Sequence, residues 1–508
     1  MSTRLYRRQF LLTPHSIDSP AEWTSTPVRG GRMLHTHPDL SVSQRTLDSL
    51  ELTLVGYAID PHHPDRDDVE ILDALLKETT QASGVLQRID TWGGRWILIA
   101  ADPSISLLIG DASGLRQAIH TAREDGVWCA SDAALLGSVL NLTDDPVAVE
   151  SFAESDYFRR ARQGWWPGDR TRYLGVRHLL PNHVLNLDSG EASRFWPSAT
   201  LEARTLASGV QRGSAILKGM VAGAVQRFPL DVALTAGLDS RLLLAACREV
   251  VDRVRFHTFI HYEIDNTSTD VVISQKLAQR FGLDHRVIEC INLREFRYSV
   301  NPTVSDYRSL YMSNTSNSHL GWGAISYTLE RMIPADRVLV KANCNEVTRH
   351  RFRVRSGDET SNPETLSQTM TTLMGMGGVD FATCAFREWA EASVDAIEAY
   401  GYDAYDIAFW EQRVGRWQAG DQLERDLDHE TFVPFNSREY FSVLLGVSSS
   451  YRKAPERLHR EMIEFMWPNI LTVPINPLPL RTRLRGAIRQ ALGATGTLNI
   501  AKRIWTKL

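Results

Sequence analysis

A run of small residues between a strand-like and a helix-like segment constrains the fold of this chain most. Residues 232–234 are apolar and have the length of a buried strand, and residues 241–249 have a helical composition. Residues 235–237 are all small, and Asp239 and Ser240 are typical of a helix N-cap. This order predicts a strand, a tight loop and a helix whose free N–H groups and dipole meet at one spot, which suits phosphate or pyrophosphate.

The loop lacks the lysine of a P-loop, which requires Gly-x-x-x-x-Gly-Lys-Ser/Thr. It resembles instead the Ser-Gly-Gly-x-Asp-Ser loop of ATP pyrophosphatases of the asparagine synthetase family, which includes asparagine synthetase B, β-lactam synthetases and lasso-peptide cyclases. The alternative is an ordinary strand–helix turn of an α/β protein. The resemblance implies ATP as cofactor and assigns its binding to Thr235, Ala236, Gly237, Leu238, Asp239 and Ser240.

Length and composition fit a globular enzyme with more than one domain. A chain of 508 residues is too long for one hydrophobic core, and its 43% hydrophobic and 23% charged residues are ordinary for a soluble protein. The net charge of -5 does not favour nucleic-acid binding, and no apolar run approaches the ~20 residues of a membrane span. The five cysteines are scattered without metal-site spacing, so we expect reduced thiols and a cytoplasmic location.

The first 205 residues are rich in short strand-like runs separated by turn residues, which predicts an antiparallel sheet with helices near 67–76 and 132–140. Four segments, in order, resemble the N-terminal glutaminase domain of asparagine synthetases. The resemblance implies an antiparallel sandwich of the Ntn-hydrolase type for residues 1–205. The matching segments are Gly94 to Asp102, Asp111 to Arg116, Trp128 to Asp132, and Tyr173 to His183 with Arg194-Phe195-Trp196.

The residue after the initiator methionine departs from that family. A glutaminase of this type uses Cys there, with its own α-amine as base, whereas this chain has Ser2. The first cysteine is Cys129, which the motif order places on an interior strand, and the family's Asn-Gly pair is missing near Val55. We therefore interpret the domain as a relic fold without glutaminase activity, with Ser2 as the alternative nucleophile.

From residue 206 onward, strands alternate with helices, as in a parallel sheet. Strand-like runs at 253–260 and 285–288 flank a helical segment at 270–282 that ends in glycine. The expected fold class is therefore mixed α/β and α+β, with an antiparallel sandwich followed by an ATP-pyrophosphatase domain over residues 206–508. By resemblance, Thr258 and Phe259 lie at the strand end that holds adenine.

A third match covers residues 337–349, at the place of the family's Ser-Gly-Glu-Gly-x-Asp-Glu. Only Glu346 is clearly retained, and Asn345 replaces the Asp. Since MgATP needs one or two protein carboxylates near the phosphates, we predict Asp239 and Glu346 as Mg²⁺ ligands. Lys341 and Arg349 could neutralise the departing pyrophosphate. The alternative is a surface loop after a strand.

Other candidate site residues come from the resemblance in the C-terminal part. A segment containing Asp421 and Glu430 resembles the family's Glu-x-Arg-x-Pro-Phe-Leu-Asp, and in β-lactam synthetases a Glu near here helps deprotonate the amine. We predict Glu430 as the base. The family's pyrophosphate lysine has no clean counterpart, and among Lys453, Arg457 and Arg460 we favour Arg457.

Three further segments carry less chemistry. His319, in a polar glycine-rich loop, is a candidate substrate contact, although a lone loop histidine is more often structural. Residues 410–417 have the pattern of a core-facing aromatic stripe with ion pairs. The tail from Arg481 is basic, so a solvated helix is expected, and docking to an acidic carrier or peptide is the alternative.

Together these features predict an ATP-dependent ligase that adenylates a carboxylate, releases pyrophosphate and passes the acyl group to ammonia or an amine. The carboxylate is a small molecule or a peptide, and the setting is the biosynthesis of a specialised metabolite or modified peptide. Two alternatives remain: an ammonia-dependent asparagine synthetase and a non-catalytic scaffold. The sequence leaves the oligomeric state open, a homodimer included.

Overall fold

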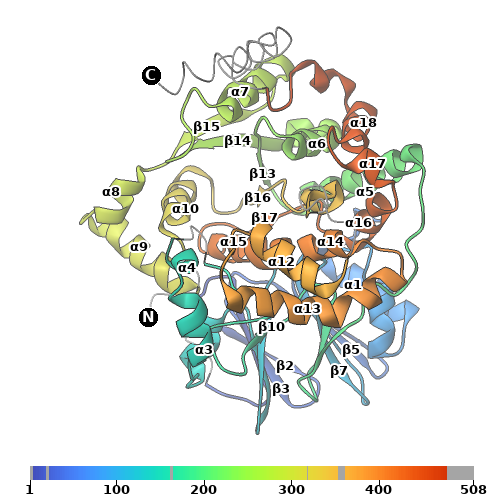
Figure 1. Ribbon diagram of the computed structural model, residues 1–508, viewed down its shortest axis with the longest axis vertical. Helices are drawn as coiled ribbons and strands as arrows, with labels where there is room; N and C mark the ends of the chain where they lie inside the picture. Colours follow the sequence, from blue (N-terminus) through green and yellow to red (C-terminus); the bar gives the residue numbers. More distant parts are fainter. Residues whose placement is uncertain (1–3, 19–21, 161–163, 317, 353–360, 478–508) are drawn as a thin grey trace.

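The computed structural model describes residues 4–18, 22–160, 164–316, 318–352 and 361–477. Ser2 and the basic tail from Arg481 lie outside these residues. Figure 1 shows antiparallel sheets at one end of the molecule and a parallel sheet with its helices toward the other. None of the helices in the described ranges has the length and apolar character that crossing a bilayer requires.

The N-terminal half contains two six-stranded antiparallel sheets that pack face to face. Successive side chains of a strand point to opposite faces of the sheet. Leu12 and Leu34 of the first sheet therefore pack against Val55 and Ile99 of the second, whereas Leu11 faces outward. The first sheet has the order β10 (Arg177–His178), β8 (Ile119–Arg123), β9 (Gly126–Ala130), β1 (Phe10–Thr13), β3 (Arg32–Thr36), β2 (Thr24–Val28). The second has the order β12 (Ala192–Arg194), β11 (His183–Asn186), β7 (Ser106–Gly110), β6 (Gly93–Ala101), β5 (Leu50–Ile59), β4 (Val42–Leu47).

Helices cover the outer faces of both antiparallel sheets. Helix α1 (Asp68–Glu78) packs Leu72 and Leu75 against the second sheet, and a capping box between Asp67 and Glu70 fixes its start. Helix α2 (Ala133–Val139) covers the first sheet. Both helices were predicted, and the antiparallel sandwich is confirmed. Two short helices follow: α3 (Pro146–Ala148) and α4 (Asp156–Arg160).

The second half is built on a five-stranded parallel sheet, which confirms the predicted α/β part. The chain enters at β13, adds strands on one side and then crosses to the other. The carboxyl ends of β13 and β16 therefore flank the point where the strand order reverses. The spatial order is β15 (His285–Glu289), β14 (Val254–Ile260), β13 (Leu230–Ala233), β16 (Val338–Val340), β17 (Thr431–Phe432).

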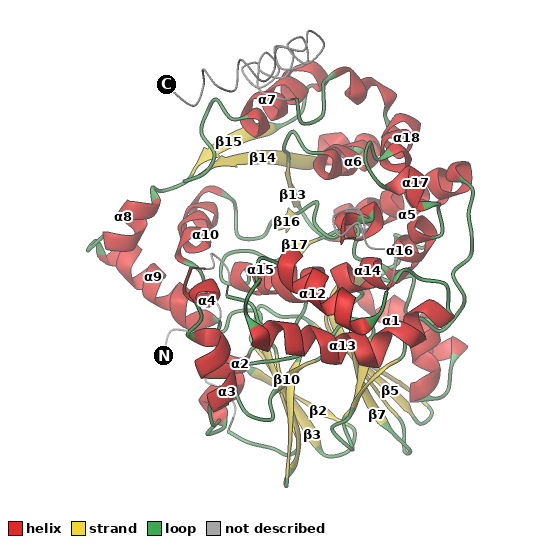
Figure 2. Cartoon of the chain, viewed as in Figure 1, coloured by secondary structure: helices red, strands yellow, loops and turns green. Residues whose placement is uncertain are grey.

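Helices lie on both faces of the parallel sheet, as buried parallel strands require. One face packs against α5 (Leu206–Arg227), α6 (Leu238–Ala246), α7 (Thr269–Phe281) and α18 (Arg457–Met466), and the other against α10 (Leu320–Met332). Figure 2 shows how the remaining helices surround this core. They are α8 (Leu293–Tyr298), α9 (Pro302–Asn314), α12 (Pro363–Leu373), α13 (Asp380–Ala399), α14 (Ala404–Ala408), α15 (Ala419–Arg425), α16 (Arg438–Leu445) and α17 (Ser449–Arg452).

The two halves share a buried interface. The Tyr57 hydroxyl donates to the carbonyl of Thr431 at 2.7 Å, and Arg95 forms a salt bridge with Asp426. The π-helical segment η5 (Phe409–Gln418) buries Trp410 completely and pairs Glu411 with Arg194. The predicted core-facing stripe at 410–417 is therefore confirmed.

Candidate functional site

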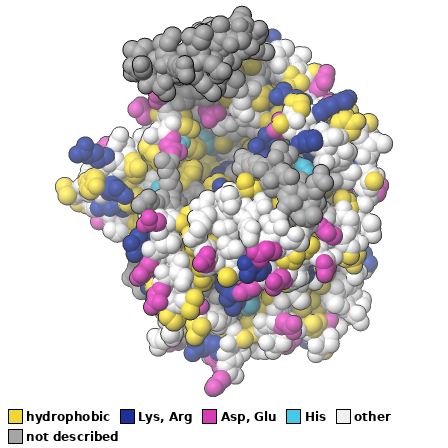
Figure 3. All heavy atoms as spheres, in the orientation of Figure 1, with side chains coloured by type: hydrophobic (Ala, Val, Ile, Leu, Met, Phe, Trp, Pro, Cys, Tyr) yellow, Lys and Arg dark blue, Asp and Glu magenta, His cyan; other side chains and the backbone are white. Residues whose placement is uncertain are grey.

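The main candidate site is a pocket at the carboxyl ends of β13, β14 and β16, where the strand order reverses. Its volume is about 310 Å³, and α10, η5 and α15 form its other walls. Figure 3 shows this face of the molecule hollowed there, with hydrophobic side chains in the hollow. Of the predicted site residues, those that line it are Thr235, Gly237, Asp239, Ser240, Phe259 and Lys341.

The loop after β13 is closed by its own side chains. The Ser240 hydroxyl accepts from the Thr235 N–H and donates to the Thr235 carbonyl, both at 3.0 Å. The Gly237 N–H donates to the Thr235 hydroxyl at 3.2 Å. Because all of these bonds join residues of the loop itself, they hold it in one compact, preorganised form.

The helix begins earlier than the sequence predicted. Helix α6 starts at Leu238 with Gly237 as N-cap, so Asp239 and Ser240 lie in its first turn and the N-cap prediction is wrong. The reason is that the Ser240 hydroxyl bonds back to Thr235. Because no side chain caps α6, its first N–H groups remain available to an anion.

Two of the six predicted loop residues face away from the pocket. The side chains of Ala236 and Leu238 are buried in the hydrophobic core, and the Ala236 N–H donates to Asp270 at 2.9 Å. Leu238 therefore contributes only its backbone to the site, and Ala236 contributes its backbone and its small size.

Asp239 is already engaged by two donors. Its Oδ1 accepts from Asn345 Nδ2 at 2.6 Å and its Oδ2 from Arg349 Nη1 at 2.7 Å. Arg349 also donates through Nη2 to Glu456 at 2.9 Å. Asn345 and Arg349 both belong to the short helix η4 (Asn345–Arg349), which follows β16 and so brings these groups to the loop.

Glu346, also on η4, differs from Asp239 because one of its carboxylate oxygens has no donor. Its Oε2 is buried without a hydrogen-bond partner. Burial, followed by the nearby charge of Asp239, raises the pKa of Glu346 to about 7. A free buried carboxylate oxygen fits a cation, so Glu346 suits the predicted Mg²⁺, whereas Asp239 has no oxygen without a donor.

His257 is a pocket residue that sequence reasoning missed. Its Nδ1 lies 2.5 Å from Asp231 Oδ1, and Arg286 holds the other oxygen of Asp231 at 2.8 Å. Burial alone would raise the pKa of Asp231, but His257 and Arg286 lower it. Asp231 therefore accepts the Nδ1–H of His257, a pocket-lining side chain that is only 2% exposed.

The two residues predicted for adenine point in opposite directions. Phe259 stacks near His257, with ring centroids 6.2 Å apart, and lines the pocket with Trp322 and Leu329 of α10. Thr258 lies on the other face of β14, where its hydroxyl donates to the Leu234 carbonyl at 2.6 Å. The pocket thus has an apolar and aromatic end beside β14 and a phosphate-type loop at the other end.

Two cationic side chains line the wall of the pocket formed by the end of β16 and by α15: Lys341 and Arg425. Lys341 forms a salt bridge with Asp421 of α15, and burial lowers the pKa of Lys341 although Asp421 opposes the change. Arg425 of α15 lies 5.1 Å from the centre of the Trp322 ring. Asp421 Oδ1 is buried without a partner, so this group can accept a further donor from a ligand.

The structure does not bring Glu430 to the pocket. Its carboxylate lies between Arg95 Nη1 at 2.9 Å and Arg116 Nη2 at 2.8 Å, at the interface of the two halves. Burial would raise its pKa, but Arg116, Arg95 and Arg8 together lower it to about 2. A carboxylate this acidic is a poor proton acceptor at neutral pH.

The predicted basic residues of α17 and α18 also lie elsewhere. Arg457 is on the solvent side of α18, 60% exposed, and pairs with Glu461 at 2.6 Å. Arg460 donates to the Pro455 carbonyl at 2.9 Å, and Lys453 is exposed. Arg457 faces solvent because Leu458, Met462 and Ile463 form the buried face of α18. His319 caps α10 through Gly321 N, which is the structural role considered from the sequence.

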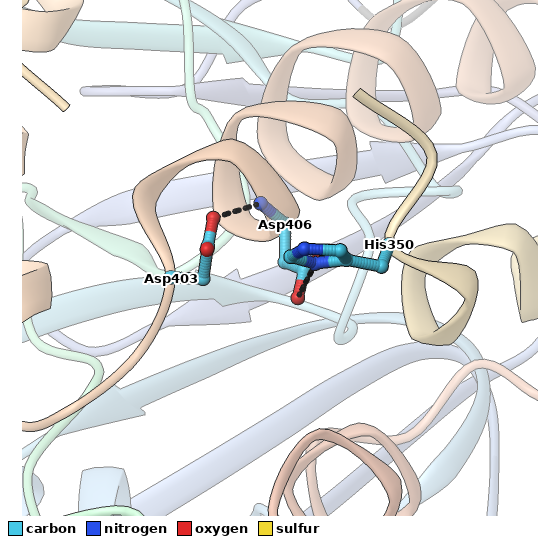
Figure 4. Close-up of side chains that lie close together, drawn as sticks. All are labelled: His350, Asp403 and Asp406. Carbon is cyan, nitrogen blue, oxygen red and sulfur yellow. Dashed lines mark hydrogen bonds and ion pairs between the residues drawn. The ribbon is translucent and has the colours of Figure 1, made fainter. Parts of the chain in front are cut away.

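A second polar cluster lies at the C-terminal end of η4 and consists of His350, Asp403 and Asp406. Figure 4 shows His350, Asp403 and Asp406 close together, with His350 Nδ1 3.2 Å from Asp406 Oδ1. Arg452 Nη1 already binds Asp406 Oδ2 at 2.9 Å, and Asp403 caps α14. Arg452 therefore already supplies a positive charge to this cluster, and the contacts of the cluster connect α14, α17 and η4.

No protein-family model matches the sequence, and no curated protein matches it. Among solved structures, it is similar to a glutamine phosphoribosylpyrophosphate amidotransferase from B. subtilis complexed with ADP and GMP. The identity is 10%, 74% of each chain is covered, and the TM-score is 0.24. A structure of the allosteric regulatory enzyme of purine biosynthesis gives the same values. Likeness at this level assigns no activity to this chain.

Proposed function

We propose that this protein is an ATP-dependent ligase that adenylates a carboxylate and transfers the acyl group to ammonia or an amine. The observation that carries the proposal is the preorganised loop at 235–240. It presents an uncapped helix N-terminus to a pocket that also has an aromatic end and two cations. This is the arrangement that a nucleoside triphosphate and an anionic second substrate require.

In the first step, a substrate carboxylate oxygen attacks the α-phosphorus of ATP, and the bond to the bridging oxygen of pyrophosphate breaks. The N–H groups at the start of α6 bind the phosphates, and the apolar end beside Phe259 receives the base, with His257 Nε2 accepting a ligand N–H. Mg²⁺, held by the phosphates and Glu346, would supply further charge neutralisation. Positioning and charge stabilisation account for most of the acceleration.

In the second step, the amine nitrogen attacks the acyl carbon, AMP leaves with the bonding electrons, and the nitrogen releases its proton to water. Lys341 and Arg425, which line the pocket wall, act before this step, where they hold the substrate carboxylate until it is adenylated. We do not carry Glu430 forward as the base, because its ion pairs hold it at the interface.

The nitrogen source in this proposal is free ammonia or an amine, which can belong to the same molecule as the carboxylate. Cys129 is fully buried on β9, and burial raises the pKa of its thiol. The first strand begins at Phe10, and Arg8 is buried with its guanidinium on the Asp426 carbonyl. These features support a structural role for residues 1–205. A cytoplasmic location and the boundary near residue 205 remain part of the proposal.

Pyrophosphate release from ATP and Mg²⁺ tests the proposal over a panel of carboxylates that includes aspartate, with ammonia or hydroxylamine as the amine. Asp239→Ala should abolish the release, whereas Asp252→Ala, an exposed aspartate beyond α6, is the matched control. Release with aspartate alone would favour the ammonia-dependent asparagine synthetase. Failure of the folded protein to bind ATP would favour the non-catalytic scaffold.

A further inference from the structure

The bonds of Asp239 conflict with the role that its loop motif implies. Both carboxylate oxygens accept from protein donors, Asn345 Nδ2 at 2.6 Å and Arg349 Nη1 at 2.7 Å. A divalent cation on either oxygen would lie next to the Arg349 guanidinium, and two cations on one carboxylate repel each other. Asp239 is therefore occupied by a positive charge that belongs to the protein.

Arg349 is held in this position from several sides. Its second nitrogen donates to Glu456 at 2.9 Å, and its side chain is only 8% exposed. Its Nε is buried and has no hydrogen-bond partner, which leaves one strong donor of a fixed cation unused.

Through its bond to Asp239 in the first turn of α6, Arg349 places a positive charge beside the helix N-terminus, where it favours phosphate. Guanidinium groups bind phosphate oxygens through several N–H donors in one plane, and they remain charged at every physiological pH. The neighbouring Glu346 still offers a free oxygen for one ion. The site thus combines the positive charge of Arg349 with one free carboxylate oxygen, on Glu346, that can bind a single metal ion.

We infer that Arg349 takes the place of a divalent cation at Asp239, so that the loop at 235–240 binds the triphosphate with only a weak dependence on Mg²⁺. This inference rests on the proposed function, because it concerns the same nucleotide. It differs from that function in assigning the charge at Asp239 to the protein rather than to a metal.

Calorimetric binding of ATP to the full chain, once with excess Mg²⁺ and once with EDTA, tests the inference. For the unmodified protein we expect the two dissociation constants to agree within about tenfold. Arg349→Met should weaken binding in EDTA by about tenfold to a hundredfold, the range expected for a lost charge-assisted hydrogen bond. Added Mg²⁺ should restore most of that loss, because Asp239 then becomes free to bind the ion.

Three further variants make the result specific. Arg212→Met removes an exposed arginine of α5 and should change neither constant. Arg349→Lys should keep part of the metal-independent binding because the charge remains. If Arg349→Met is poorly folded, the double variant Arg349→Met/Glu456→Gln avoids an unpaired carboxylate and should show the same metal dependence.

The outcomes separate the inference from the proposed function. ATP binding that needs Mg²⁺ in the unmodified protein, or an Arg349→Met variant with unchanged metal dependence, would overturn the inference and leave the ligase proposal standing. Absence of ATP binding under both conditions would overturn both. Inorganic pyrophosphate as a second probe should reproduce the pattern, because the contacts at Arg349 concern phosphate and not the base.

Discussion

Replacing Glu430 with glutamine distinguishes a structural carboxylate from a catalytic one. Arg95 and Arg116 lower the pKa of this buried carboxyl from an ordinary 4.5 to about 2. That difference corresponds to about 3 kcal/mol of native-state stability at pH 7. Because the pKa is lowered by folding, the stabilisation is complete above about pH 4.5 and is lost as the pH falls toward 2. Glu430→Gln should therefore lower the free energy of unfolding by up to about 3 kcal/mol at pH 7.

Urea unfolding followed by tryptophan fluorescence measures this difference directly. The gap between the unmodified protein and the variant should stay constant from pH 8 to pH 5 and narrow below about pH 4.5. ATP binding and pyrophosphate release, measured at a temperature where both proteins are folded, should be unchanged. A variant with full stability but no amide formation would refute this reasoning and return Glu430 to the role of base.

Three other substitutions test two pocket side chains and one buried carboxyl group of α15. Lys341→Met should lower carboxylate-dependent pyrophosphate release by about tenfold or more, because a charge-assisted hydrogen bond is lost, while ATP binding measured alone persists. His257→Phe should weaken ATP binding by up to about tenfold, the value of one neutral hydrogen bond, in calorimetry. Burial raises the pKa of Glu424 to about 8, so its native-state stabilisation is complete below about pH 4.5 and disappears by pH 8. The melting temperature of the unmodified protein should therefore fall relative to Glu424→Gln between about pH 5 and pH 8, and parallel curves would contradict this.

Local patterns in the sequence were sufficient to predict the elements of the fold. Helix α1 was predictable because Asp67 and Glu70 form a capping box before an apolar stripe. Strands β13, β14 and β15 were predictable because short apolar runs alternate with helical segments, whereas β17 was not predicted. The start of α6 was not predictable, because the hydroxyl of Ser240 can cap a helix or bond back to Thr235, and only the closed loop decides between them.

The site was predictable where it depends on neighbours in sequence and not where it depends on distant partners. The loop at 235–240 lies at the pocket because a loop after a parallel strand must lie at that edge. The environment of Glu430 depends on Arg95, which lies 335 residues earlier. His257 looked like an ordinary strand residue, and its significance appears only when β13 places Asp231 beside it. The pairing of Arg349 with Asp239 likewise joins residues 110 positions apart.

The contacts between the two halves give the antiparallel sandwich a structural role beside the pocket. Asp426 and Glu430 are buried carboxylates of the second half, and their cations come mainly from Arg95 and Arg116 of the first. Removing one partner of a buried ion pair costs about 3–5 kcal/mol because the remaining charge is left uncompensated. Glu430 directly precedes β17, which pairs with β16, and β16 leads into the pocket residue Lys341. The antiparallel sandwich thus stabilises the strands that carry the pocket wall.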